Sequence, residues 1–111
     1  MRIRLAFRAL GAAAPALAFA ATGAGAAEHR VTMAGMQYQP AAITAKVGDT
    51  IVFVNDDTVD HAVFVPTKGH AVSLGAQKPG STVALPLRRS GSFEVECVNH
   101  AAMLLKVTVQ N

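Results

Sequence analysis

The most chemically distinctive part of the sequence is the stretch CVNHAAM, residues 97–103. It contains Cys97, the only cysteine in the chain, followed by His100 three positions later and Met103 three positions after that. A thiolate, an imidazole and a thioether at this spacing are metal-ligating groups that one loop can bring together. The alternative is ordinary packing, because a lone cysteine is commonly a small buried residue and methionine fills gaps in a core.

The N-terminal residues predict the cellular compartment of the protein and therefore the redox conditions around this thiol. Three arginines lie within the first eight residues, followed by an apolar Ala-rich run over residues 9–21 and the small residues AGA at 24–26. This order is typical of a secretory signal peptide with an A-x-A cleavage site, and the apolar run is shorter than the ~20 residues of a membrane-spanning helix. We therefore predict a signal peptide over residues 1–26, cleaved after Ala26 or Ala27, with export to the periplasm and no stable membrane insertion.

Composition favours one small domain without a nucleic-acid partner. The 111 residues carry a formal net charge of +3, all of which comes from the three arginines of the predicted signal peptide. The mature chain is therefore near neutral and gives no electrostatic reason to bind nucleic acid. Residues 27–111, about 85 residues, are enough for one domain with a thin core. One cysteine cannot form a disulfide within the chain, so a bound metal would both tie down the loop and protect the sulfur.

The segments that must position this loop have the pattern of an all-β domain. Short runs rich in β-branched and aromatic residues alternate with turn pairs, and no amphipathic helical pattern appears after the predicted signal peptide. The runs are residues 30–33, 41–47, 50–55, 61–66, 81–87, 92–97 and 104–109. About seven strands predict a β-sandwich or a small barrel. Residues 67–78 show no strong periodicity and are expected to form a loop.

The alternation within residues 92–97 orients the sulfur. Phe93, Val95 and Cys97 share one face of the predicted strand, which is the apolar face, while the glutamates between them share the other. We therefore expect the thiol to point into the core at the end of its strand. The loop that follows can then curl His100 back over the sulfur.

The donor types select the metal. Soft sulfur donors combined with imidazole suit copper, and a His₂Cys set with a weak axial methionine is the ligand pattern of blue-copper sites. The loop supplies Cys97, His100 and Met103 but only one histidine, so a second must come from elsewhere. The candidate is His61, at the start of another predicted strand. Zinc also binds cysteine and histidine well, and its presence would be a substitution for the functional metal.

With these residues in place, the sequence resembles a known family. MQYQP at 36–40, KVGDTIVFVN at 46–55, the histidine at position 61 and GSFEVECVNHAAMLLKVTV at 91–109 occur in the order found in cupredoxins, the type 1 blue copper proteins. The resemblance is to the amicyanin and plastocyanin group, and the short C-x-x-H-x-x-M spacing is more similar to amicyanin. It spans about residues 31–109, essentially the whole predicted mature domain.

This resemblance implies a Greek-key β-sandwich that binds one copper ion, Cu(II) or Cu(I). The implied ligands are His61, Cys97, His100 and Met103. It also implies that Asn55 ties the ligand loops together near the cysteine, and that the His100 side is an exposed apolar edge through which electrons pass. In the same way it implies that Met36 packs in the core.

The sequence therefore predicts a monomeric periplasmic carrier of single electrons and not an enzyme. Its expected partners are periplasmic redox proteins, namely a dehydrogenase or a c-type cytochrome, and closeness to amicyanin implies a role in methylamine oxidation. The alternative function is a copper chaperone or sequestration protein that uses the same ligands, although the chain has only four methionines. A multicopper oxidase needs histidines flanking the cysteine, whereas Cys97 lies between Glu96 and Val98.

The remaining polar residues are predicted to lie outside the site. We expect His29 and His70 to be surface residues, and the alternative is a secondary contact with copper. The acidic residues Asp56, Asp57 and Asp60 are expected to form a solvated loop next to His61 that could touch a basic partner.

Overall fold

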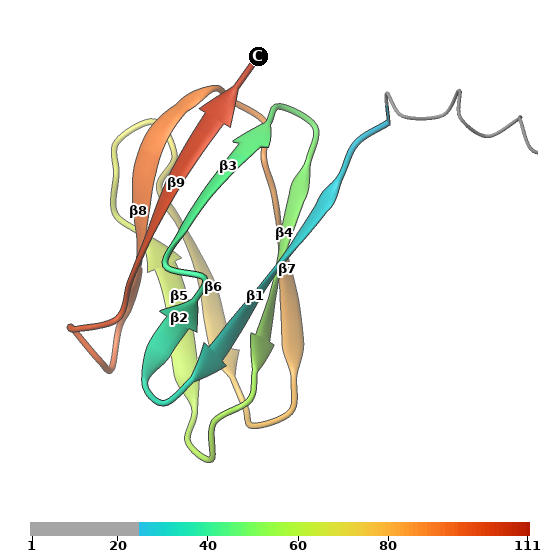
Figure 1. Ribbon diagram of the computed structural model, residues 1–111. Helices are drawn as coiled ribbons and strands as arrows, with labels where there is room; N and C mark the ends of the chain where they lie inside the picture. The colour runs from blue at the N-terminus through green and yellow to red at the C-terminus, as the bar shows by residue number, and fades with distance from the viewer. Residues whose placement is uncertain (1–24) are drawn as a thin grey trace, which may run out of the picture.

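The computed structural model of the protein describes residues 25–111, which form a β-sandwich (Figure 1). The predicted signal peptide, residues 1–26, lies outside the described residues except for its last two positions. Nine strands occur in the described region: β1 (Glu28–Ala34), β2 (Gln37–Gln39), β3 (Ala42–Lys46), β4 (Thr50–Asn55), β5 (His61–Val65), β6 (Val72–Gln77), β7 (Thr82–Pro86), β8 (Gly91–Cys97) and β9 (Leu104–Gln110). Within residues 25–111, no helix is long and apolar enough to cross a membrane.

The strands form two sheets that pack face to face. One sheet has the order β2-β1-β4-β7 and the other the order β3-β9-β8-β5-β6. Most neighbours are antiparallel, but β1 pairs with β4 and β3 pairs with β9 in parallel, so the chain crosses between the sheets. The prediction of an all-β sandwich is confirmed.

Each of the seven predicted runs overlaps a strand, but two strands were not expected. The prediction that residues 67–78 form a loop is wrong, because β6 occupies residues 72–77 and pairs with β5 across a register shift between Ala62 and Phe64. This edge strand includes Gly75 with φ of 77°, and its buried and exposed residues do not alternate strictly. Pairing with β5 stabilises a strand that the local sequence pattern does not predict. The other addition, β2, has only three residues.

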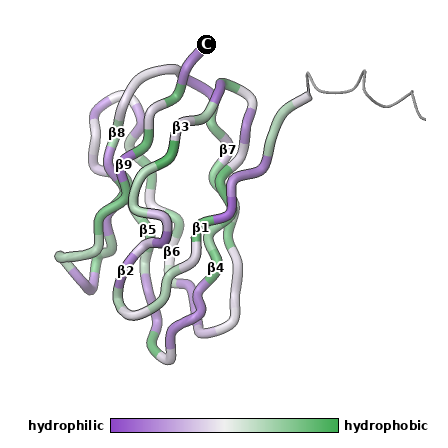
Figure 2. The backbone as a smooth tube through the Cα atoms, in the orientation of Figure 1, coloured by the Kyte–Doolittle hydropathy of each residue, from purple (hydrophilic) through white to green (hydrophobic). Residues whose placement is uncertain are grey.

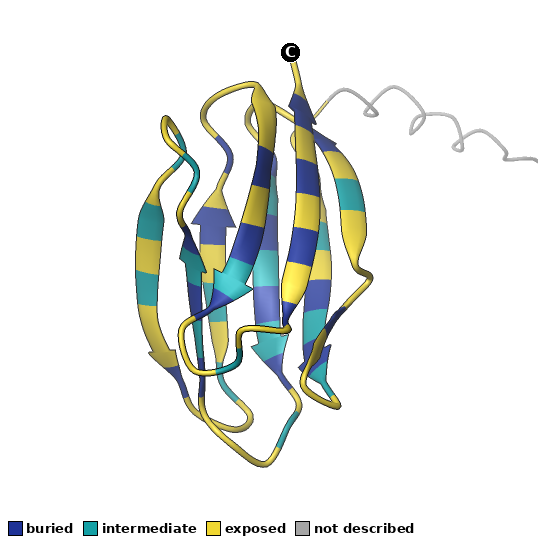
Figure 3. Ribbon diagram, turned by 90° about the vertical axis from the view of Figure 1, so that its left-hand side faces the viewer, coloured by how far each residue is buried: buried dark blue, intermediate teal, exposed yellow. Residues whose placement is uncertain are grey.

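The core lies between the sheets and follows the period-two pattern. In β8, Phe93, Val95 and Cys97 are buried while the residues between them are exposed or partly exposed, and β9 alternates in the same way. Figure 3 shows this alternation as bands along the strands, and Figure 2 shows the hydropathy changing repeatedly along the same segments. The sulfur of Cys97 therefore faces the core at the end of β8, as the sequence predicts.

Candidate metal centre

Sheet pairing brings His61 and Cys97 together although they are 36 positions apart. β5 and β8 run antiparallel with Val63 opposite Cys97, so the start of β5 lies beside the end of β8. The Val98 N–H donates to the Ala62 carbonyl at 2.9 Å and extends this pairing past the cysteine. His61 is fully buried and Cys97 is 2% exposed. The strand register alone thus places an imidazole beside the thiol.

The loop between β8 and β9 returns His100 to the same place. Its backbone makes two turn hydrogen bonds, from the His100 N–H to the Cys97 carbonyl at 3.3 Å and from the Met103 N–H to the His100 carbonyl at 3.0 Å. These two turns reverse the chain, so that His100 lies over the sulfur and Met103 lies at the entry to β9. Met103 is 1% exposed, whereas His100 is partly exposed.

Three donor atoms converge on one small volume. The Nδ1 atoms of His61 and His100 are 3.2 Å apart, and the Cys97 Sγ lies 3.7 Å from the first and 3.6 Å from the second. All three ligand atoms lie within 4.8 Å of one another. Two imidazole nitrogens and a thiolate around a common centre suit copper or zinc, and the buried Met103 in the same loop carries a thioether, the soft donor that completes the ligand pattern of a blue-copper site. The chemistry of the donor set thus fits a copper ion.

Asp57 orients His61, a role that the sequence analysis missed. The His61 Nε2 lies 2.7 Å from Asp57 Oδ2, so a proton on Nε2 leaves Nδ1 free to bind a metal. The prediction of a solvated loop is wrong for this residue, because its side chain is only 14% exposed and makes specific contacts. The hydrogen bond with His61 is the main cause that lowers the pKa of Asp57 below its usual value. The signal that could have found it is the placement of a carboxylate four residues before a candidate ligand.

The turn between β1 and β2 holds the Asp57 carboxylate in place. The N–H groups of Gly35 and Met36 donate to its two oxygens at 2.6 and 3.0 Å. Both residues have φ of 61°, the conformation of a type I′ hairpin turn, so successive N–H groups point to one anion. The implied core position of Met36 is wrong, because its side chain is 41% exposed at this turn.

Asn55 stabilises the loop that carries Asp57 and His61. This fully buried residue donates from Nδ2 to the carbonyls of Val59 at 2.9 Å and Gln77 at 2.8 Å, and its Oδ1 accepts from the Asp57 N–H at 3.0 Å. The implied role therefore needs correction. Asn55 fixes the β4–β5 loop against β6, and among residues 25–111 its side chain makes no hydrogen bond to the loop after Cys97.

The cysteine sulfur also has a backbone partner. The Ala62 N–H donates to Cys97 Sγ at 3.3 Å. A hydrogen bond to a ligating sulfur withdraws electron density from it and is one of the means by which a protein tunes a copper site. Position 62 thus contributes through its backbone whichever side chain it carries.

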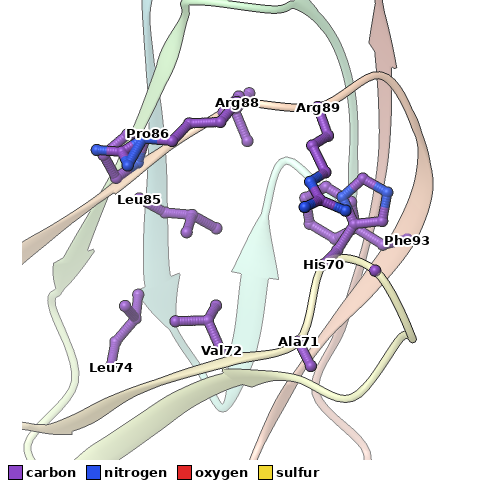
Figure 4. A pocket seen from close by; sticks show the side chains of 11 residues that line it. His70, Ala71, Val72, Leu74, Leu85, Pro86, Arg88, Arg89 and Phe93 are labelled. Atoms are coloured by element: carbon purple, nitrogen blue, oxygen red, sulfur yellow. The ribbon is translucent and has the colours of Figure 1, made fainter.

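The other residues considered in the sequence analysis lie outside the metal centre. His29 pairs with Asp49 near the start of β1. His70 stacks on Phe93 with ring centroids 4.8 Å apart, and with Arg88 and Arg89 it lines a cleft of about 570 Å³ between the edges of the two sheets (Figure 4). None of the four predicted ligands lines this cleft.

Comparison with known proteins gives the class to which this fold and donor set belong. Residues 26–110 match the family described as copper binding proteins of the plastocyanin/azurin family. The chain therefore belongs to this family of cupredoxins, and the cluster of His61, Cys97, His100 and Met103 is consistent with a single type 1 copper site.

Within this family, the chain is similar to proteins named MauL and to amicyanin. The chain is 34% identical to methylamine utilization protein MauL of Methylorubrum extorquens over 98 residues, which cover 84% of this chain and 86% of that protein. It is 33% identical to the protein of the same name from Methylophilus methylotrophus over 75 residues, which cover 65% of this chain but only 43% of that protein's length. Among solved structures, it is similar to the Cu(I) form of an amicyanin variant, with 28% identity, a TM-score of 0.68 and coverage of 82% of this chain and 88% of that one.

Proposed function

We propose that this protein is a periplasmic carrier of single electrons that holds one copper ion through His61, Cys97, His100 and Met103. The observation that carries the proposal is the convergence of two Nδ1 atoms and one Sγ within 4.8 Å at a buried position. Copper bound there would supply a Cu(II)/Cu(I) couple that accepts and releases one electron.

The residues around the donors favour a rigid site. His61 is held by Asp57, which the β1–β2 turn holds in turn, and Cys97 is fixed by its strand and by the Ala62 N–H. Because these contacts are set by the folded chain, little rearrangement is needed when the charge of the centre changes. The alternative function of copper delivery requires ready release, which the complete burial of His61 opposes.

Exposed apolar side chains in the segments that carry the candidate ligands support electron exchange near His100. Five large hydrophobic residues are exposed in the described region, and four of them lie close in sequence to a candidate ligand or in the turn that contacts Asp57. They are Met36, Val59, Val98 and Leu104. Exposed apolar side chains suit transient docking, which would bring a partner's redox group close to the partly exposed His100.

The proposed partners and location follow from the start of the chain and from the relatives. We assign residues 1–26 to a cleaved signal peptide and residues 27–111 to the copper domain, which acts as a monomer in the periplasm. Its partners would be periplasmic redox proteins, namely a dehydrogenase or a c-type cytochrome. The name of the two MauL relatives supports a place in methylamine utilization.

Absorption spectroscopy with voltammetry tests the proposal. The copper-loaded protein should show an intense thiolate-to-copper charge-transfer band that disappears on reduction and returns on oxidation in a one-electron wave. Cys97→Ser and His100→Gln should lose the band, whereas the matched control His70→Gln should keep it because His70 lies in the distant cleft. A colourless Cu(II)-loaded protein, or a band that survives Cys97→Ser, would overturn the proposal.

A further inference from the structure

The first residues of the proposed mature chain converge on one buried carboxylate. The Ala27 N–H donates to Asp49 Oδ1 at 2.8 Å, and the His29 Nε2 lies 2.8 Å from Asp49 Oδ2. Asp49 is 6% exposed, and its Oδ2 also accepts the Lys46 N–H at 2.9 Å. These contacts, with that from Ala27 the largest, lower the pKa of Asp49 to about 2. The carboxylate is thus an anion that holds both the backbone nitrogen of residue 27 and the imidazole of residue 29.

The two cleavage positions that the sequence allows leave different contacts in the folded domain. Cleavage after Ala26 turns the Ala27 nitrogen into an ammonium group beside Asp49 and keeps the Ala27 carbonyl, which accepts the Thr50 N–H at 3.0 Å. Cleavage after Ala27 would remove both contacts. A cationic donor strengthens a hydrogen bond to a carboxylate, so the folded domain is more stable when Ala27 is its first residue, the product of the A-x-A pattern at residues 24–26.

The resulting terminus, Ala27–Glu28–His29, carries a free amine and a histidine at the third position. Such a terminus offers four nitrogens: the amine, the two following backbone amides after they lose their protons, and the imidazole Nδ1. Four nitrogens in one plane are the geometry that Cu(II) and Ni(II) prefer. Binding would release the two amide protons, and the ammonium proton where present, to solvent. Because the contact of His29 with Asp49 uses Nε2, the chelate uses the other ring nitrogen.

We propose that the processed N-terminus is a second copper site, which binds Cu(II) and is restrained by Asp49. It lies near the start of β1, whereas the metal centre lies beyond its other end, where Gly35 contacts Asp57 (Figure 1). At ~3.3 Å per residue, the strand between them separates the two sites by about 20 Å. The inference rests on the proposed export and cleavage but not on the ligands of the first site.

The folded structure competes with metal binding at this second site and therefore lowers its affinity for Cu(II). β1 pairs with β4 from Glu28 onward, and successive N–H groups of an extended strand point in opposite directions. The amides of residues 28 and 29 can share one metal only when the first three residues leave the β4 edge. Ala27 and Glu28 are exposed and His29 is 25% exposed, so this rearrangement uncovers little buried surface. The main restraint is the pair of contacts with Asp49. They compete with the metal for the Ala27 amine and hold the His29 imidazole in place.

The test uses the full chain exported by a bacterial host and purified from the periplasm. Intact mass should show Ala27 as the first residue. Protein whose first site is already filled with copper should bind one further equivalent of Cu(II). Calorimetry measures this binding, and electron paramagnetic resonance should show a second, tetragonal Cu(II) signal. A mass that begins at another residue would overturn the proposal and leave the assignment of the first site intact.

Three variants locate the second site. His29→Gln should lose the extra equivalent and keep the charge-transfer band of the first site, which also reports that the protein is folded. A chain that begins at Ala26 moves the histidine to the fourth position and should bind Cu(II) at least about tenfold more weakly, although Asp49 is unchanged. Asp49→Asn should bind it about tenfold more tightly, since it loses charge-assisted contacts that compete with the metal. An extra equivalent that survives His29→Gln unchanged, or that the Ala26 chain binds equally well, would overturn the proposal.

Discussion

Replacing Asn55 with alanine should destabilise the fold by an amount that follows from its three hydrogen bonds. The side chain is fully buried, donates to two carbonyls and accepts one N–H. At about 1 kcal/mol of net stability for each hydrogen bond, the loss is about 3 kcal/mol. One kcal/mol lowers the melting temperature of a domain of 60–100 residues by about 4–8 °C, so the melting temperature should fall by about 12–24 °C.

The measurement is denaturant unfolding of the metal-free protein, because bound copper would add its own binding free energy to the folded state. Gln39→Ala is the matched control. The Gln39 amide also contacts a carbonyl, at 3.4 Å from Ala34, but it is exposed, so its loss should change stability by less than about 0.5 kcal/mol. If Asn55→Ala cost less than about 1 kcal/mol, the hydrogen bonds assigned to the β4–β5 loop would not be what holds it.

Three further substitutions test the surroundings of the centre. Asp57→Asn should raise the midpoint potential in voltammetry, because removing a negative charge beside His61 disfavours the more highly charged Cu(II) state; an unchanged or lower potential would contradict that reasoning. Met103→Leu should keep the copper and shift the potential, so copper loss would show that the ligand set is wrong. Tyr38→Phe should cost about 1 kcal/mol in denaturant unfolding, because the buried hydroxyl donates to the Glu96 carbonyl at 2.9 Å, and a neutral substitution would show that this contact adds nothing.

The sequence was sufficient to predict the parts of the fold that rest on local patterns. Alternation of apolar and polar residues in β8 placed Cys97 in the core, and β-branched runs marked seven of the strands. It failed at β6, where pairing with β5 imposes an edge strand that contains Gly75 and lacks strict alternation. A strand that is stabilised mainly by pairing with its neighbour shows only a weak strand pattern in its own sequence.

The candidate ligands were predictable because their donor types are unusual, but their supporting contacts were not. Cys97 and His100 share a short motif, and His61 stood at the start of a predicted strand. The contact of Asp57 with His61 depends on the conformation of the β4–β5 loop and on two N–H groups of a different hairpin. Similarly, the Asn55 hydrogen bonds join segments whose proximity appears only after the sheets have formed.

A crystal structure of the copper-loaded protein tests the central claim most directly. We expect one copper ion bound by the Nδ1 atoms of His61 and His100 and by the Sγ of Cys97, at the place where these atoms already lie within 4.8 Å of one another. A copper ion bound without His61, or a structure in which His61 and Cys97 share no metal, would contradict the account.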